Sequence, residues 1–163
     1  MQIERLPRIE LPKGMKFVGR HARMSLANDR TFELWNSFMP RRNEVGLRAG
    51  SELFSIGVYP PLYFVNFDPS AEFEKWAAVR VTDVVSIPDG METIASPEGA
   101  YAVFKYTGLP SDGGKAFDYI FGTWLPNSGY VLEERPHYAV MGEKYRNGDP
   151  ASEEELWLPV RLK

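Results

Sequence analysis

Hydrophobic and polar positions predict the same series of elements in the two halves of the chain. Residues 15–25 (MKFVGRHARMS) have the pattern of a strand, and residues 28–40 (NDRTFELWNSFMP) have that of a helix. Asn28 or Asp29 is a suitable N-cap for this helix, and Pro40 is expected to end it. Two further strand-like runs follow, ELFSIGVYPP and EFEKWAAVRV. The first half therefore predicts the order strand, helix, strand, strand.

The second half predicts this order again. Residues 100–108 are β-branched and aromatic and are expected to form a strand, after which Ser111 or Asp112 can cap a helix. The apolar stripe of this helix consists of Phe117, Ile120, Phe121 and Trp124. Pro126 and Gly129 are expected to end it. The runs PHYAVMGEKY and EEELWLPVRL supply the last two strands, and METIA predicts a short strand between the halves.

The two halves also share a phrase. Residues 66–81 (NFDPSAEFEKWAAVRV) and 147–162 (NGDPASEEELWLPVRL) are identical at eight of sixteen positions, where average composition predicts about one match. We therefore expect a single α+β domain, residues 1–163, built from two strand-helix-strand-strand modules at about 1–82 and 90–163. Two such modules would form an antiparallel sheet with paired helices, a pseudo-twofold axis and a central groove.

The repeated strands have two chemically different faces, because successive side chains of a strand point to opposite sides. The faces expected beneath the helices carry Phe73, Ala77, Val79 and Val81 in the first copy, with Lys75 as an exception, and Leu156, Leu158, Val160 and Leu162 in the second. The opposite faces carry Glu72, Glu74, Trp76 and Arg80 in the first copy and Glu153, Glu155, Trp157 and Arg161 in the second. A Glu-x-Trp pair is thus predicted off the helix-covered core in both copies.

A tryptophan and a carboxylate on one open face suit a flat, apolar cation. The indole face attracts a cation by roughly 0.5 to 2 kcal/mol, and the carboxylate supplies the counter-charge. The alternative is a solubilising glutamate beside a tryptophan that packs against a loop. The duplication favours a groove, since two related strands can face each other across it.

The amino-acid composition limits the kinds of binding partner expected for this chain. The chain has a formal net charge of −3 and one basic doublet, Arg41-Arg42, which argues against direct nucleic-acid binding. It contains no cysteine, which suits the cytoplasm. The start, MQIERLPRIELPKG, lacks the apolar run of a signal peptide or membrane span. His21 and His137, its two histidines, lie far apart in the sequence, so we expect no metal site, and no motif calls for a cofactor.

The second half resembles the GyrI-like small-molecule-binding domain, which is also the effector-binding domain of AraC-type and multidrug-sensing regulators. The resemblance rests on YAVFKYTG, FDYIFGTWLPNSGY, RPHYAV and EEELWLPVRL, above all on Trp124 to Gly129 and Glu155 to Val160. One difference is Ala139, where many relatives carry an acidic residue.

The resemblance implies a stand-alone protein that binds hydrophobic, cationic small molecules in an aromatic groove, with Glu155 as the counter-charge. We expect the ligand-binding residues to be Glu155, Trp157, Tyr138, Trp124, Trp76 and Phe54, with Glu74 as the first module's counterpart of Glu155. Trp124 also completes the apolar stripe of its helix, which is an alternative role. Two other functions stay open: hydrolysis of electrophilic toxins with Glu155 as general base, and binding of a macromolecular partner as a gyrase-inhibitor-type module.

Overall fold

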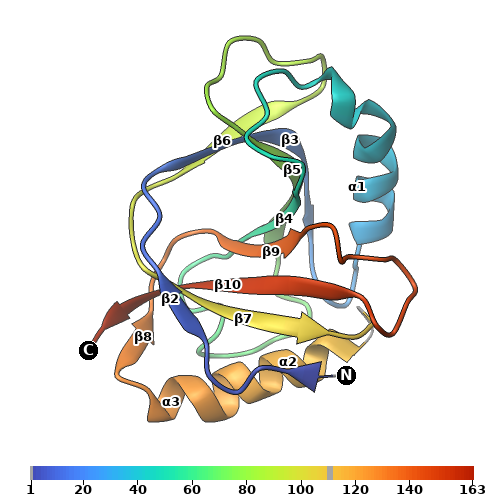
Figure 1. The fold of residues 1–163 in the computed structure, drawn as a ribbon. Coiled ribbons are helices and arrows are strands. Elements are labelled where there is room, and N and C mark those ends of the chain that lie inside the picture. Colours follow the sequence, from blue (N-terminus) through green and yellow to red (C-terminus); the bar gives the residue numbers. More distant parts are fainter. Residues whose placement is uncertain (1, 110–111) are drawn as a thin grey trace.

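The computed structural model describes residues 2–109 and 112–163, which form a ten-stranded antiparallel sheet with helices beside it (Figure 1). The first half contains β3 (Met15–Met24), α1 (Thr31–Phe38), β4 (Leu53–Val58) and β5 (Phe73–Val81). The second half contains β7 (Tyr101–Thr107), α2 (Gly113–Tyr119), β9 (His137–Met141) and β10 (Glu153–Leu162). The predicted α+β class and the repeated order of elements are confirmed.

Four short strands extend the sheet. They are β1 (Gln2–Ile3), β2 (Arg8–Glu10), β6 (Glu92–Ser96) and β8 (Tyr130–Leu132). Of these, only β6 was predicted, from the run METIA. Strands β1 and β2 both pair with β7, and β8 pairs with β10. The segment before β3 is therefore part of the sheet, a contribution that its charged and proline-rich sequence did not indicate.

The two halves meet at strands β4 and β9 in the middle of the sheet. The strand order is β1-β7-β10-β9-β4-β5-β3-β6, so the series β7-β10-β9 is followed by its counterpart in reverse, β4-β5-β3. Ser55 of β4 lies opposite Ala139 of β9. This arrangement is the pseudo-twofold relation that the repeated phrase predicted.

The repeated phrase begins with the same turn in both halves. The Asp68 carboxylate accepts a hydrogen bond from the backbone N–H of Ser70 at 2.9 Å, and Asp149 accepts one from Ala151 at 2.8 Å. An aspartate that hydrogen-bonds the backbone two residues later fixes a turn. The Asp-Pro sequence therefore starts β5 and β10 in the same way, which places the glutamates and tryptophans that follow at equivalent positions.

Helical structure continues past Pro40 in the first half, whereas in the second half it ends at Asn127, between the predicted end signals Pro126 and Gly129. Helix α1 passes into a 3₁₀ helix, η1 (Met39–Glu44), that contains Pro40, and α2 passes into a π-helical turn, η3 (Ile120–Trp124), and then α3 (Leu125–Asn127), which contains Pro126. Proline lacks an N–H but is tolerated in the first turn of a new helical segment. The prolines thus mark a change of helix type. The N-cap of α1 is Arg30, one residue after the predicted Asp29, whose carboxylate accepts a hydrogen bond from the Thr31 N–H at 2.9 Å. The N-cap of α2 is Asp112, one of the two predicted residues, and it makes no side-chain capping hydrogen bond, whereas Ser111 lies outside the described residues.

The core is divided into two clusters on the helix side and one on the opposite face. Phe73, Ala77, Val79 and Val81 pack with α1, and Leu156, Leu158 and Val160 pack with α2, as predicted. Leu162, which was expected in the same core, is 70% exposed because it lies at the end of β10, where it pairs with β8. The third cluster contains Trp76, Tyr101 and Tyr138. It joins the two halves on the face opposite the helices.

Candidate functional site

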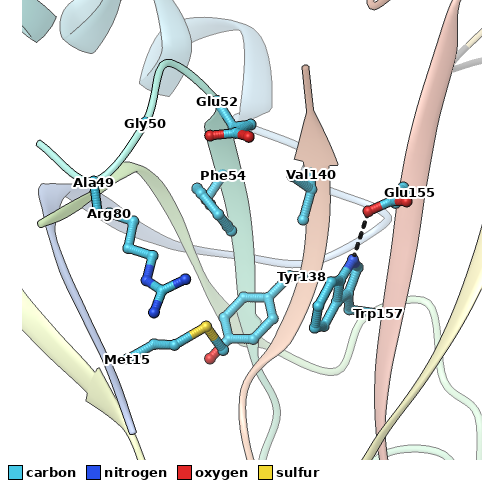
Figure 2. Close-up of a pocket in the computed structure, with 10 residues that line it drawn as sticks. All are labelled: Met15, Ala49, Gly50, Glu52, Phe54, Arg80, Tyr138, Val140, Glu155 and Trp157. Carbon is cyan, nitrogen blue, oxygen red and sulfur yellow. Dashed lines mark hydrogen bonds between the residues drawn. The ribbon is translucent and has the colours of Figure 1, made fainter. Parts of the chain in front are cut away.

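A cavity of about 260 Å³ opens beside this third cluster. Residues from five strands and one loop converge on it (Figure 2). The lining residues are Met15 of β3, Ala49, Gly50 and Glu52 of the loop before β4, Phe54 of β4, Arg80 of β5, Tyr138 and Val140 of β9, and Glu155 and Trp157 of β10. Because these residues come from both halves of the chain, the cavity lies where the two halves meet.

The apolar wall of the cavity is a network of aromatic rings around Tyr138. Its ring centroid lies 5.3 Å from those of Phe17 and Tyr101 and 6.1 Å from that of Phe54, which it meets edge to face. The Tyr101 ring in turn lies 5.7 Å from the Trp157 ring. Offset and edge-to-face contacts at these distances are favourable. They hold these largely buried rings in fixed positions beside the cavity.

The predicted Glu-x-Trp pair of the second half lies at one side of this wall. The indole N–H of Trp157 donates a hydrogen bond of 3.2 Å to Oε1 of Glu155. The other oxygen of Glu155 lies 2.8 Å from a guanidinium nitrogen of Arg8, whose charge also lies 5.9 Å from the Trp157 ring centroid. Arg8 therefore places a positive charge next to both the Glu155 carboxylate and the Trp157 ring.

The first half contains the same arrangement with a histidine, His21, in place of the arginine. The Trp76 indole donates a hydrogen bond of 2.6 Å to Glu74, and the His21 ring stacks on Trp76 at 4.4 Å. The two ring nitrogens of His21 lie 3.6 Å from Glu74 and 2.6 Å from Glu92. Trp76 is only 4% exposed, since the His21 ring covers one face of its indole. Trp76 therefore does not line the cavity.

Four of the six residues predicted to bind a ligand line the cavity, and two do not. Glu155, Trp157, Tyr138 and Phe54 are brought together there. Trp76 is covered by His21, and Trp124 lies on the helix side, where its ring is 5.1 Å from Phe104 and 6.2 Å from Tyr130. Trp124 thus packs in the helix-side cluster, outside the cavity.

Two charged residues of the cavity, Glu52 and Arg80, were not predicted as site residues. Neither forms an ion pair with any residue that the structure describes, whereas Glu155 is neutralised by Arg8. The repeated phrase had placed Arg80 on the same face as Trp76, which was a usable signal. Glu52 belongs to a loop whose direction depends on Gly50, with φ +93°, and on the hydrogen bond from the Ala49 N–H to the Arg80 carbonyl. The position of Glu52 therefore depends on contacts between residues that are distant in the sequence, and no local sequence pattern predicts it.

The histidine of β9 lies outside the cavity, in an aromatic cluster. His137 stacks on Phe64 at 5.2 Å and meets the Tyr59 ring at 4.9 Å. Burial, together with the positive charge of Arg135, lowers the pKa of His137 to about 3. Its imidazole is therefore neutral at physiological pH.

No helix within the described residues is long and apolar enough to cross a membrane.

These features define an α+β domain of two related halves with an aromatic, partly charged cavity between them. The family model of the GyrI-like small molecule binding domain matches residues 7–161. The chain belongs to this family. A search of curated proteins found no match.

Solved structures with the same fold have names that differ in function. The C-terminal domain of EcmrR has a TM-score of 0.67 at 10% identity, with 99% of this chain and 98% of that one covered. SAV2435 bound to tetraphenylphosphonium has a TM-score of 0.63 at 15% identity, with 95% and 93% covered. A hydrolase from Listeria innocua has a TM-score of 0.61 at 14% identity, with 97% and 93% covered. At sequence identities this low, the similarity to these structures establishes the fold of the chain and nothing about its function.

Proposed function

We propose that the cavity binds hydrophobic cations, with Trp157 and Tyr138 as its apolar wall and Glu155 as a counter-charge. The observation that carries this proposal is the position of the Glu155 carboxylate, hydrogen-bonded to Trp157 at the edge of an aromatic cavity. The complex of SAV2435 with tetraphenylphosphonium supports it, because that ligand is a lipophilic cation held by the same fold.

On the side where Glu52 and Glu155 lie, the cavity favours a positively charged group over a neutral group of the same shape. Two carboxylates, Glu52 and Glu155, line it, and the indole face of Trp157 attracts positive charge. Arg8 already satisfies this preference from within the chain. An incoming cation therefore shares the Glu155 carboxylate with Arg8 or displaces it, while Glu52 has no such internal competitor among the described residues.

Hydrolysis is the less favoured alternative, although one solved structure of the same fold is named a hydrolase. A general base needs a carboxylate oxygen that is free to accept a proton from water. In this chain one Glu155 oxygen accepts from Trp157 and the other pairs with Arg8. Both positions are thus held by the protein, and the arrangement suits a fixed counter-charge better than a base.

The proposal is tested with two ions of the same shape and opposite charge, tetraphenylphosphonium and tetraphenylborate, each titrated into the protein by calorimetry. We expect tetraphenylphosphonium to bind with a dissociation constant in the micromolar range, which corresponds to about −8 kcal/mol, and tetraphenylborate to bind at least about tenfold more weakly. Equal affinity for the two ions would show that charge is not recognised. Chromatography of a cationic ester after incubation checks for hydrolysis.

A further inference from the structure

The cavity contains an arginine that has no partner inside the protein. Arg80 forms no hydrogen bond or ion pair through its side chain within residues 2–109 and 112–163, and its side chain faces the cavity (Figure 2). Its counterpart in the second copy of the repeated phrase, Arg161, pairs with Glu133 at 3.1 Å. The same residue of the repeat is thus paired on the surface in one half and left unpaired beside the cavity in the other.

A second donor without a partner belongs to Tyr138. This side chain is 3% exposed, and its hydroxyl makes no hydrogen bond of good geometry with any described residue, although the Ser96 and Tyr101 hydroxyls lie close to it. The neighbouring hydroxyls of Ser96 and Tyr101 bond to each other at 3.1 Å, and Tyr101 donates to the Pro136 carbonyl at 2.8 Å. A buried donor without an acceptor costs free energy that a suitable ligand group can recover.

The two unpartnered donors lie at the same end of the cavity. Figure 2 shows the Arg80 guanidinium and the Tyr138 hydroxyl on the side of Met15, and the carboxylates of Glu52 and Glu155 on the other side. Met15 belongs to the same buried cluster as Tyr138. Because methionine is unbranched and flexible, its thioether can shift to admit a ligand atom to the hydroxyl.

The free charges of the cavity are therefore of both signs. Glu155 is neutralised by Arg8, which leaves the negative charge of Glu52 and the positive charge of Arg80 without partners in the described chain. A ligand with a positive charge alone would be attracted by Glu52 but would leave Arg80 desolvated and repelled. A ligand that also carries a carboxylate would satisfy both, since guanidinium groups bind carboxylates with charge-assisted hydrogen bonds.

We infer that the ligand of this cavity is an aromatic zwitterion, whose carboxylate is bound by Arg80 and the Tyr138 hydroxyl while its positive charge lies near Glu52 and Glu155. This inference rests on the proposed function and deepens it, because it adds an acceptor group to the hydrophobic cation. Arg80 and Tyr138 then determine specificity.

The test uses three flat dyes of similar size: 10-methylacridinium, which is a cation, 10-methylacridinium-9-carboxylate, which is a zwitterion, and acridine-9-carboxylate, which is an anion. Each is titrated with the full chain, and the dissociation constant is taken from dye fluorescence. We expect the zwitterion to bind at least about tenfold more tightly than the cation, and the anion to bind most weakly. This order supports the inference.

Two variants and one control variant test whether Arg80 and Tyr138 bind the carboxylate of the zwitterion. Arg80→Gln should weaken zwitterion binding about tenfold and leave the cation's affinity equal or higher, and Tyr138→Phe should weaken zwitterion binding several-fold. Arg161→Gln changes the equivalent arginine of the other half, which lies outside the cavity, and should alter neither affinity. Loss of zwitterion binding in Arg161→Gln as large as in Arg80→Gln would overturn the assignment.

The outcomes separate this inference from the proposed function. If the cation binds as tightly as the zwitterion or more tightly, the inference is wrong and the proposed function stands. If neither cationic dye binds but the anion does, both are wrong. If zwitterion binding is strong but unchanged in Arg80→Gln, the carboxylate is bound elsewhere and the inference is wrong.

Discussion

The guanidinium of Arg8 lies 2.8 Å from the carboxylate of Glu155, although strand β7 separates their two strands. Arg8 is opposite Val103 of β7, and Val103 is opposite Trp157 of β10, so the three residues form one row across the sheet. The length of the arginine side chain spans the intervening strand. The N-terminal strand β2 thus supplies a cation to the carboxylate that we propose as the ligand's counter-charge.

Replacing Arg8 by glutamine should strengthen binding of lipophilic cations. The variant removes the internal competitor, and because a half-exposed ion pair is worth up to about 1 kcal/mol, the affinity for tetraphenylphosphonium should rise by up to about fivefold. Calorimetric titration measures the change. The matched control is Arg5→Gln, because Arg5 lies over the Tyr119 ring at 4.7 Å and is not part of the cavity. Weaker binding in Arg8→Gln would mean that Arg8 forms part of the binding site.

Removing the Tyr138 hydroxyl should stabilise the protein. Tyr138→Phe keeps the ring that packs on Phe17 and Phe54 and deletes a buried hydroxyl without a partner. The penalty for such a group is about 1 to 3 kcal/mol, so the melting temperature should rise by several degrees, at about 2 to 4 °C per kcal/mol. Tyr101→Phe is the matched control, since it deletes a hydroxyl that donates to Pro136 and should lower the melting temperature. The same sign for both variants would contradict this account.

Acidification should destabilise the fold through His137. Its pKa is lowered to about 3 in the folded state by burial and by Arg135, whereas in the unfolded chain it is about 6.5. Between these values the unfolded state binds the additional proton, so stability decreases as pH falls from about 6.5 toward 3. At pH 5 the contribution is up to about 2 kcal/mol, or about 4 to 8 °C in melting temperature.

The variant that tests this contribution is His137→Phe, which preserves an aromatic ring between Tyr59 and Phe64. Melting curves of the wild type and the variant at pH 7 and pH 5 should show a smaller loss in the variant. The difference between the two proteins isolates His137 from carboxylates that titrate in both. An identical loss in both proteins would show that His137 does not contribute.

The sequence predicted those features that depend on local periodicity and on the repeat. The alternation in β5 and β10 placed the glutamates and tryptophans on the face opposite the helices. The shared phrase corresponds to equivalent turns at Asp68 and Asp149 in the structure. Four cavity residues followed from this reasoning together with the family resemblance: Glu155, Trp157, Tyr138 and Phe54.

The features that sequence reasoning missed depend on contacts between distant segments. His21 stacks on Trp76, and Arg8 forms an ion pair with Glu155. Both contacts follow from strand pairing across the sheet, which the periodicity within one strand does not predict. The placement of Glu52 depends on the path of a loop around Gly50. The two halves thus differ in the residues that face the tryptophans, Arg8 in one half and His21 in the other, where the repeat alone predicted symmetry.

The most direct test of the proposed site compares the same substitution at two equivalent positions. Glu155 and Glu74 each accept a hydrogen bond from the tryptophan two residues later, but only Glu155 lines the cavity. Calorimetric titration with tetraphenylphosphonium should show an affinity about tenfold lower for Glu155→Gln and within about twofold of the wild type for Glu74→Gln. Equal affinities for Glu155→Gln and the wild type would contradict the assignment of Glu155 as the counter-charge.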